Sequence, residues 1–301
     1  MAKQRLYYLD ALKGILIILV ILGHSIQYKI MDYQHDVLFR VIYSFHMPLF
    51  FLISGFLTYK GRYDAFMVKK RFVQCIIPFV SWAFLLPIFE SGIYDFERTI
   101  KILTYPDNGL WFLYNLFFYC LVLNFSERLS NQKFKQEYVL LTICVILYVL
   151  MPFLHTRFNV TQICWYLPFF AMGYYIRKYP NLLDCKGVSI AIMGGQFCIA
   201  WMLSIIFLDL RVFMVLPLFV LFYNWNLESK PVYKMMRQSS ILIFTLHFIF
   251  IGIFRMVCPD VELLQHGLFL YVILVLLCLL SSLVILKLKD YKIFSWLKYS
   301  Y

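Results

Sequence analysis

The chain has 301 residues, of which 62% are apolar and only 15% are charged. Soluble globular proteins carry roughly 25% charged residues, so this composition excludes a soluble fold and predicts an integral membrane protein. The formal net charge is +12, but the basic residues fall in short runs between apolar stretches. That distribution excludes a nucleic-acid-binding surface and is typical of membrane topology. The eight cysteines show neither metal-ligand spacing nor a disulfide framework, so we expect no metal site.

Apolar stretches alternate with short polar segments along the whole chain. A membrane-spanning helix needs ~20 mostly apolar residues, and about ten stretches meet or approach that length. We expect an all-α, polytopic fold in a single transmembrane domain over residues 1–301, with no fused soluble domain. The expected spans are 7–27, 37–59, 72–90, 109–124, 138–154, 162–177, 188–206, 210–225, 239–258 and 266–288.

Basic residues between the expected spans predict their orientation. With the N-terminus in the cytoplasm, 20 of the 28 Lys and Arg residues fall in cytoplasmic segments, six fall in external ones, and Lys13 and Arg255 lie inside spans. Cytoplasmic segments of membrane proteins are enriched in Lys and Arg. The external basic residues are Lys29, Arg40, Arg98, Lys101, Arg157 and Arg211. The sequence therefore predicts an even number of spans with both termini in the cytoplasm.

The first expected span carries three ionisable residues, Asp10, Lys13 and His24. At 3.6 residues per turn, Lys13 and His24 lie within about 20° of one helix face and about 16 Å apart along the axis. Asp10 lies on the same side, three residues before Lys13. Ionisable residues inside a membrane are costly and usually face a cavity or a partner. We interpret this stripe as functional; the structural alternative is a buried Asp10–Lys13 pair with His24 at its far end.

The second expected span places His46 near mid-depth, followed by Pro48. Proline donates no backbone hydrogen bond, so we expect it to kink or loosen the preceding turn and to turn carbonyl groups toward a partner or a cavity. Ser54 and Gly55 favour close helix packing. A histidine at this depth is either a packing residue with one hydrogen bond or part of a site.

Motifs in both spans resemble those of the acyltransferase-3 family of membrane acyltransferases, and most closely its fucose 4-O-acetylase-like branch. The motifs are LDALKG at 9–14, VILGH at 20–24 and FHMPLFFLISG at 45–55. Weaker similarities follow in order as KKR at 69–71, IPF at 77–79, LWFL at 110–113, FFAMGYY at 169–175 and LHF at 246–248. The resemblance covers nearly the whole chain.

The resemblance implies about ten helices in a bacterial cytoplasmic membrane and an enzyme that uses acyl-CoA, usually acetyl-CoA, from the cytoplasm. It implies a carbohydrate acceptor, such as an O-antigen, capsule or exopolysaccharide sugar. The family's first-span signature is a basic residue, commonly Arg, ten positions and then His, which Lys13 and His24 match with Lys in place of Arg. Lysine is a point charge rather than a bidentate fork, so it is less suited to clamping a planar anion.

The same resemblance assigns candidate roles. His24, and after it His46, would take the proton from the attacking sugar hydroxyl, or a histidine would carry the acyl group itself. Lys13 would stabilise the thioester oxyanion or hold part of coenzyme A. Asp10 would orient a neighbouring helix or the cofactor.

Coenzyme A is a multiply charged anion, so its head would stay near the cytoplasmic face. Candidate residues for it are Arg62, Lys69, Lys70 and Arg71, of which Arg71 matches the family motif. Plain positive-inside topology is the alternative for this basic run. Weaker candidates for substrate contacts are Trp111, Ser54 and His247.

Two rival functions remain open from the sequence. One is a polysaccharide or small-molecule transporter or flippase without chemistry, although transporters often show internal repeats and paired broken helices, and neither is evident. The other is a succinyltransferase of the same fold.

Overall fold

The computed structural model describes residues 7–29, 32–60, 65–106, 110–130, 135–154, 157–183 and 212–224. All regular elements in these ranges are helices. The chain divides into two compact units: unit 1 comprises residues 1–50 and 186–301, and unit 2 comprises residues 51–185. The boundary between the two units falls inside one long helix, Val37–Thr58.

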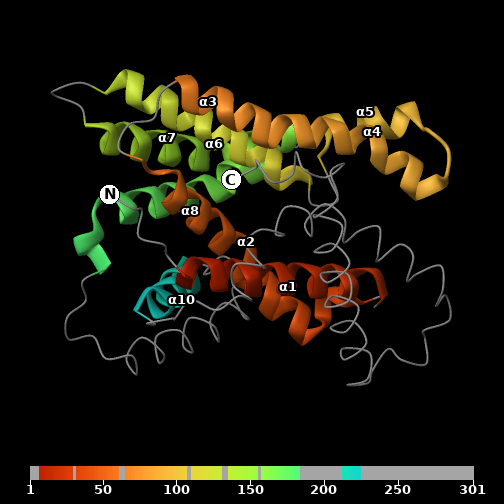
Figure 1. Cartoon of the computed structure of the whole chain (residues 1–301), viewed down its shortest axis with the longest axis horizontal. Coiled ribbons are helices and arrows are strands. Elements are labelled where there is room, and N and C mark those ends of the chain that lie inside the picture. Colours follow the sequence, from red (N-terminus) through yellow and green to blue (C-terminus); the bar gives the residue numbers. More distant parts are fainter. Residues whose placement is uncertain are drawn as a thin grey trace. The chain divides into compact units, whose positions relative to one another are not determined.

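Unit 1 contains α1 (Tyr7–Lys29), the 3-10 helix η1 (Tyr33–His35), the first part of α2 (Val37–Thr58) and α10 (Val212–Asn224). Tyr8, near the start of α1, packs edge-on against Phe219 and Tyr223 of α10, with ring centroids 6.4 and 5.5 Å away. Figure 1 shows α10 beside the red α1 ribbon.

Unit 2 is built around α6 (Leu110–Leu129), which contacts helices on both its N-terminal and C-terminal sides in the sequence. The remaining helices are α3 (Ala65–Arg71), η2 (Phe72–Ile76), α4 (Ile77–Ser91), α5 (Phe96–Thr104), α7 (Gln136–Leu150), η3 (Met151–Phe153), η4 (Arg157–Asn159), α8 (Val160–Lys178) and η5 (Pro180–Leu183). In Figure 1, α3 leads into α4, and this continuous helix runs alongside α6, which also contacts α7. The second part of α2 also belongs to this unit.

Five helical stretches in the described part of the chain are long and apolar enough to cross a membrane. They are Tyr7–His24, Val37–Thr58, Ala65–Ile88, Leu110–Leu129 and Gln136–Phe153. They coincide with the first five expected spans, and α8 coincides with the sixth as a helix. The expected span at 210–225 contains α10, whereas 188–206, 239–258 and 266–288 lie outside the described residues. The helix count of ten and the orientation therefore stay predictions.

The third span begins earlier than its apolar run suggests, because α3, the π-helical turn η2 and α4 follow one another without a break from 65 to 91. Pro78 lies in the first turn of α4. Having no N–H, it cannot donate to the carbonyl four residues earlier, and a π turn is one way for a helix to absorb that missing bond. The basic residues at 69–71 are thus helical, not part of a loop.

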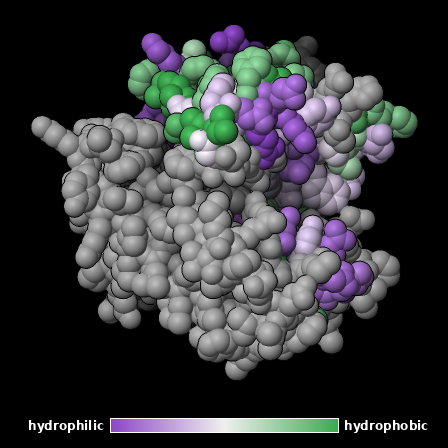
Figure 2. All heavy atoms as spheres, turned by 90° about the vertical axis from the view of Figure 1, so that its right-hand side faces the viewer, coloured by the Kyte–Doolittle hydropathy of each residue, from purple (hydrophilic) through white to green (hydrophobic). Residues whose placement is uncertain are grey.

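The segment between the third and fourth spans contains α5, a short helix that the sequence analysis treated as part of an external segment. Asp95 caps its start by accepting a hydrogen bond from the Arg98 backbone N–H at 3.0 Å. Thr99 and Ile102 are buried against the protein, while Phe96 and Ile100 are exposed. Figure 2 faces the side of Figure 1 where α4 and α5 lie, and apolar and hydrophilic side chains adjoin one another there.

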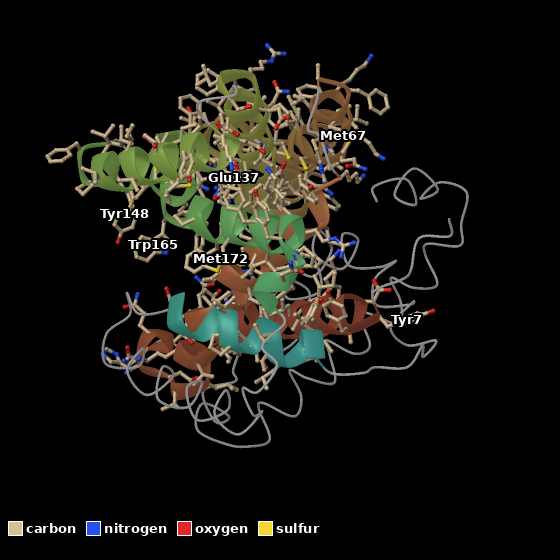
Figure 3. All side chains as sticks on the ribbon, turned by 90° about the vertical axis from the view of Figure 1, so that its left-hand side faces the viewer. Tyr7, Met67, Glu137, Tyr148, Trp165 and Met172 are labelled. Carbon is tan, nitrogen blue, oxygen red and sulfur yellow. The ribbon has the colours of Figure 1, made fainter. Side chains whose placement is uncertain are left out.

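Apolar side chains also cover the outer face of α7. Leu141, Val145 and Val149 are 60%, 53% and 61% exposed. A contiguous apolar surface of this kind is unfavourable in water and suits contact with lipid. At the far end of α7, the Tyr148 ring stacks on Trp165 of α8 with centroids 5.8 Å apart, a pair visible in Figure 3.

Candidate active site

The three side chains of the predicted polar stripe in α1 are buried or half-buried. Asp10 and Lys13 are only 6% and 8% exposed, and His24 is half-buried. Asp10 lies in the first turn of α1, where the partial positive charge of the helix N-terminus favours a carboxylate. Two ionisable side chains are therefore held inside the protein at the start of the helix that carries His24.

His24 lies in a polar cluster formed by α1 and α2. Its Nδ1 atom is 3.2 Å from Oε1 of Gln27, one turn later in α1, and 3.4 Å from the hydroxyl of Tyr43 in α2. The Tyr43 hydroxyl donates to the same Gln27 oxygen at 3.3 Å. The three side chains thus share one small hydrogen-bonded group.

His46 is buried at 2% exposure on the face of α2 that carries Tyr43. Its Nδ1 atom is 2.7 Å from the backbone carbonyl oxygen of Ile42. Because a carbonyl oxygen only accepts hydrogen bonds, Nδ1 carries the proton and, in the neutral ring, Nε2 carries the lone pair. The backbone of α2 therefore fixes the tautomer of His46 as one whose Nε2 can accept a proton.

The structure brings the two predicted histidines around one tyrosine. The Tyr43 ring meets the His46 ring at 4.6 Å and the His24 ring at 6.4 Å between centroids, edge-on in both cases. Tyr43 and Gln27 were not among the residues predicted for the site. Each lies three residues from a predicted histidine, and that helical spacing could have flagged both.

Arg71 is the predicted coenzyme A residue that the structure holds most firmly. It is half-buried and donates to the Thr58 hydroxyl at 3.2 Å and to Gln74 Oε1 at 3.4 Å. Arg177, which the sequence analysis did not single out, lies over the Phe56 ring with its Cζ atom 5.0 Å from the centroid. Two arginines from different helices therefore contact the last turns of α2.

The other predicted cofactor residues are less constrained. Lys69 and Lys70 are exposed on α3. Arg62 lies outside the described residues, as does His247 among the substrate candidates.

Trp111 belongs to a group of aromatic rings inside unit 2. Its ring stacks on Tyr166 with centroids 5.5 Å apart and lies 5.9 Å from Phe51 of α2. Trp111 and Tyr166 are half-buried, whereas Phe51 is fully buried. Ser54, one turn beyond Phe51, is half-buried, and its carbonyl accepts the Thr58 hydroxyl at 2.7 Å.

A second polar cluster, which no sequence motif predicted, joins the start of α7 to the end of α8. Gln136 is buried, and its Oε1 accepts from Tyr174 and from Lys178. Glu137, labelled in Figure 3, pairs with Lys178 at 2.6 Å and accepts from the Tyr179 hydroxyl. The hydrogen bond to the Glu137 carboxylate raises the pKa of Tyr179. These contacts tie two helix ends together and require no ligand.

Within the described ranges, no three His, Cys, Asp or Glu side chains come together as metal ligands. The cysteines in those ranges, Cys75, Cys120, Cys144 and Cys164, are buried thiols, as expected for cysteine used as a small apolar residue.

Helices long enough to span a membrane, with ionisable residues buried in the first of them, define a polytopic membrane protein with an internal polar site. The profile of the acyltransferase-3 family, described as an acyltransferase domain, matches residues 6–287. The chain therefore belongs to the acyltransferase-3 family.

Two curated relatives carry the name nodulation protein NolL. The one from Sinorhizobium fredii is 30% identical over 191 residues, which cover 58% of this chain and 49% of the relative. The one from Mesorhizobium japonicum is 26% identical over 235 residues, covering 73% of this chain and 56% of the relative. The chain thus spans about half the length of these relatives. No solved structure matches the chain.

Proposed function

We propose that this chain is a membrane O-acyltransferase that moves an acyl group, in the first instance acetyl, from cytoplasmic acyl-CoA to a carbohydrate hydroxyl. Membership of the acyltransferase-3 family supports the reaction class. The motifs at 9–14 and 45–55 favour the fucose 4-O-acetylase-like branch and a bacterial cytoplasmic membrane. The observation that carries the proposal is that Tyr43 contacts both histidines, His24 through its hydroxyl and His46 through the edge of its ring.

The reaction needs one proton acceptor and one stabiliser of negative charge. The acceptor hydroxyl attacks the thioester carbonyl carbon while its proton passes to an imidazole nitrogen, for which His24 is the first candidate and His46 the second. The tetrahedral oxyanion then collapses and the C–S bond breaks. The CoA sulfur leaves and recovers the proton from the imidazolium, giving an O-acyl ester and free CoA thiol. Lys13 is the candidate for stabilising the oxyanion.

The substitution His24→Ala tests whether His24 takes the proton of the acceptor hydroxyl. The variant should fold and bind CoA normally, because His24 is half-buried and no large core volume is lost. Transfer from radiolabelled acetyl-CoA to a glycan acceptor should fall by at least ~10²-fold, the usual loss for a general acid–base group. A folded, CoA-binding His24→Ala protein with near-wild-type transfer would contradict the proposal.

The same assay separates the rival functions. Succinyl-CoA in place of acetyl-CoA tests the succinyltransferase. Acceptor movement across vesicles without any loss of acyl-CoA would indicate a transporter.

The donor is proposed to bind through Arg71 at the cytoplasmic side. The CoA head is anionic, and Arg71 is held by two side chains beside the end of α2. Arg71→Ala should weaken CoA binding measured by calorimetry, and Arg71→Lys should weaken it less, because charge is kept but the fork is lost. Arg98→Ala, on α5, is the matched control and should bind CoA normally. The donor site is wrong if Arg98→Ala weakens binding and Arg71→Ala leaves it intact.

The orientation proposed is ten spans with both termini in the cytoplasm. It rests on the 20-to-six distribution of basic residues. Reporter fusions after residues 65, 132, 182 and 233 should read cytoplasmic, and fusions near 34, 98 and 158 should read external. A cytoplasmic reading near 98 or an external one after 65 would overturn this topology.

A further inference from the structure

Tyr43 is held in one place by neighbours on several sides. Its ring stacks on Phe39 with centroids 3.9 Å apart and an interplanar angle of 26°, and it meets His46 edge-on. On the α1 side it fills the space left by Gly23, where an added Cβ would come within 2.8 Å of the Tyr43 ring. A ring packed in this way delivers its hydroxyl to a fixed point beside His24.

The hydrogen bonds at that point favour one tautomer of His24. Gln27 Oε1 is an amide oxygen with two lone pairs, and it lies within reach of two donors, the Tyr43 hydroxyl at 3.3 Å and His24 Nδ1 at 3.2 Å. Both contacts are satisfied together when Nδ1 carries the proton. In the neutral imidazole, Nε2 then carries the lone pair.

We propose that Tyr43 and Gln27 are positioning residues that hold the His24 proton on Nδ1, so that Nε2 is the atom that takes the acceptor hydroxyl's proton. Tyr43 and Gln27 touch neither substrate in this proposal; they act through His24. The inference rests on the proposed function for its catalytic meaning, but the tautomer itself is a property of the resting protein.

Both histidines then carry the proton on Nδ1, but different groups hold it there. The Ile42 carbonyl sets the His46 tautomer through the backbone, which a side-chain substitution cannot remove. The His24 tautomer depends on side chains, and a wrong tautomer presents an N–H where the reaction needs a lone pair. Loss of Gln27 or of the Tyr43 hydroxyl should therefore affect His24 alone.

The direct test is ¹⁵N NMR of full-length protein labelled at histidine, with the His24 signal assigned by comparison with His24→Gln. Wild-type protein should show a protonated Nδ1 and an unprotonated Nε2 for His24. Gln27→Leu should shift His24 toward the other tautomer or a mixture. Gln27→Glu should keep the wild-type tautomer, because a carboxylate offers only acceptor oxygens.

Kinetics supply the second readout. Tyr43→Phe and Gln27→Leu should each lower kcat by about 10-fold, part of the 10²–10⁴-fold that a general base contributes, with KM for acyl-CoA unchanged. Gln27→Glu should retain most of kcat. Because the residues act as one unit, the double variant should lose less than the product of the two single losses.

Tyr33→Phe is the matched control, since Tyr33 packs on Phe39 in the same aromatic group and should leave both the tautomer and kcat unchanged. The proposal is overturned if wild-type His24 carries its proton on Nε2, or if Gln27→Leu keeps both the Nδ1–H form and normal kcat. A protein with the expected tautomer but no acyl transfer would contradict the proposed function and leave the positioning role standing.

Discussion

Glycine lets helices approach closely in both units, but what fills the space differs. In unit 1, the gap beside Gly23 of α1 is occupied by the side chain of Tyr43. In unit 2, Gly55 of α2 lies against α8, and Gly173 of α8 lies against α2. A methyl group added at Gly55 would overlap the backbone carbonyl of Phe170, and one added at Gly173 would overlap that of Leu52. One contact is backbone against ring, and the other is backbone against backbone.

The difference separates a contact that builds the fold from one that places a functional group. A helix backbone cannot move locally without moving its whole helix, so the contact between α2 and α8 tolerates no added atom. An aromatic ring can rotate or shift by a fraction of an ångström. Substitution of glycine should therefore cost stability in unit 2 and activity in unit 1.

The largest expected effect is that of Gly55→Ala or Gly173→Ala. Each adds one methyl group that would overlap a carbonyl of the facing helix, so α2 and α8 must separate and give up the packing around Phe51, Phe56 and Phe170. We expect destabilisation of more than about 3 kcal/mol, beyond the usual cost of overpacking. The measurement is the yield of monodisperse protein in detergent and its thermal unfolding.

Ala171→Gly, in the same stretch of α8, is the control that removes one methyl group instead of adding one. It should cost about 1 kcal/mol from helix propensity and about 0.8 kcal/mol from the lost burial of that methyl group. If Gly55→Ala and Gly173→Ala unfold at the wild-type temperature, the close approach of these helices is wrong.

Gly23→Ala is expected to have an intermediate effect, and on the rate of acyl transfer instead of on stability. The added methyl group would push the Tyr43 ring, which lies 2.8 Å from the ideal Cβ position, and would move its hydroxyl away from His24. Acyl transfer should fall by about 10-fold, as for loss of the hydroxyl itself, while unfolding changes little.

The distinguishing measurement is the pair Gly23→Ala and Gly23→Ala/Tyr43→Phe. Once the hydroxyl is gone, displacing the ring should cost little more in kcat. A Gly23→Ala protein that unfolds like Gly55→Ala would erase the contrast between the two units.

Among the glycines of unit 2, the smallest loss of stability is expected for Gly92→Ala. Gly92 ends α4 with φ of 76°, and its N–H donates to the Ile88 carbonyl at 2.8 Å. Nothing lies within 4 Å of an added Cβ there, so the penalty is the left-handed backbone alone, about 1–2 kcal/mol. Thermal unfolding should therefore place Gly92→Ala between wild type and Gly55→Ala, and Gly92→Asn, which tolerates this conformation better, closer to wild type.

The sequence predicted those features that follow from periodicity along a single segment. The first six expected spans are helices, and the stripe of Asp10, Lys13 and His24, whose side chains are buried or half-buried, lies on one of them. Tyr43 was missed because its role depends on which face of α2 meets α1, and pairwise spacing within one helix does not carry that information.

Other features were beyond the sequence for different reasons. The contact between Gly55 and Gly173 joins residues far apart in the chain. α5 was treated as part of an external segment because nine residues are too few to register as a span. Arg177 belongs to a predicted cytoplasmic basic segment, and its sequence neighbours do not distinguish it from the other basic residues there. Its contact with the Phe56 ring depends on how α8 packs against α2.

The π turn at 72–76 shifts the angular phase of the third span. One extra residue in a helix rotates all later side chains by about 100° relative to those before it. A helical-wheel diagram drawn through the whole of 65–91 would therefore place Lys70 and Phe79 about 180° apart, whereas the extra residue brings them to about 80° of one another. Any cross-link, spin label or substitution series designed along this helix has to be numbered separately on either side of Ile77, as though two helices met end to end there.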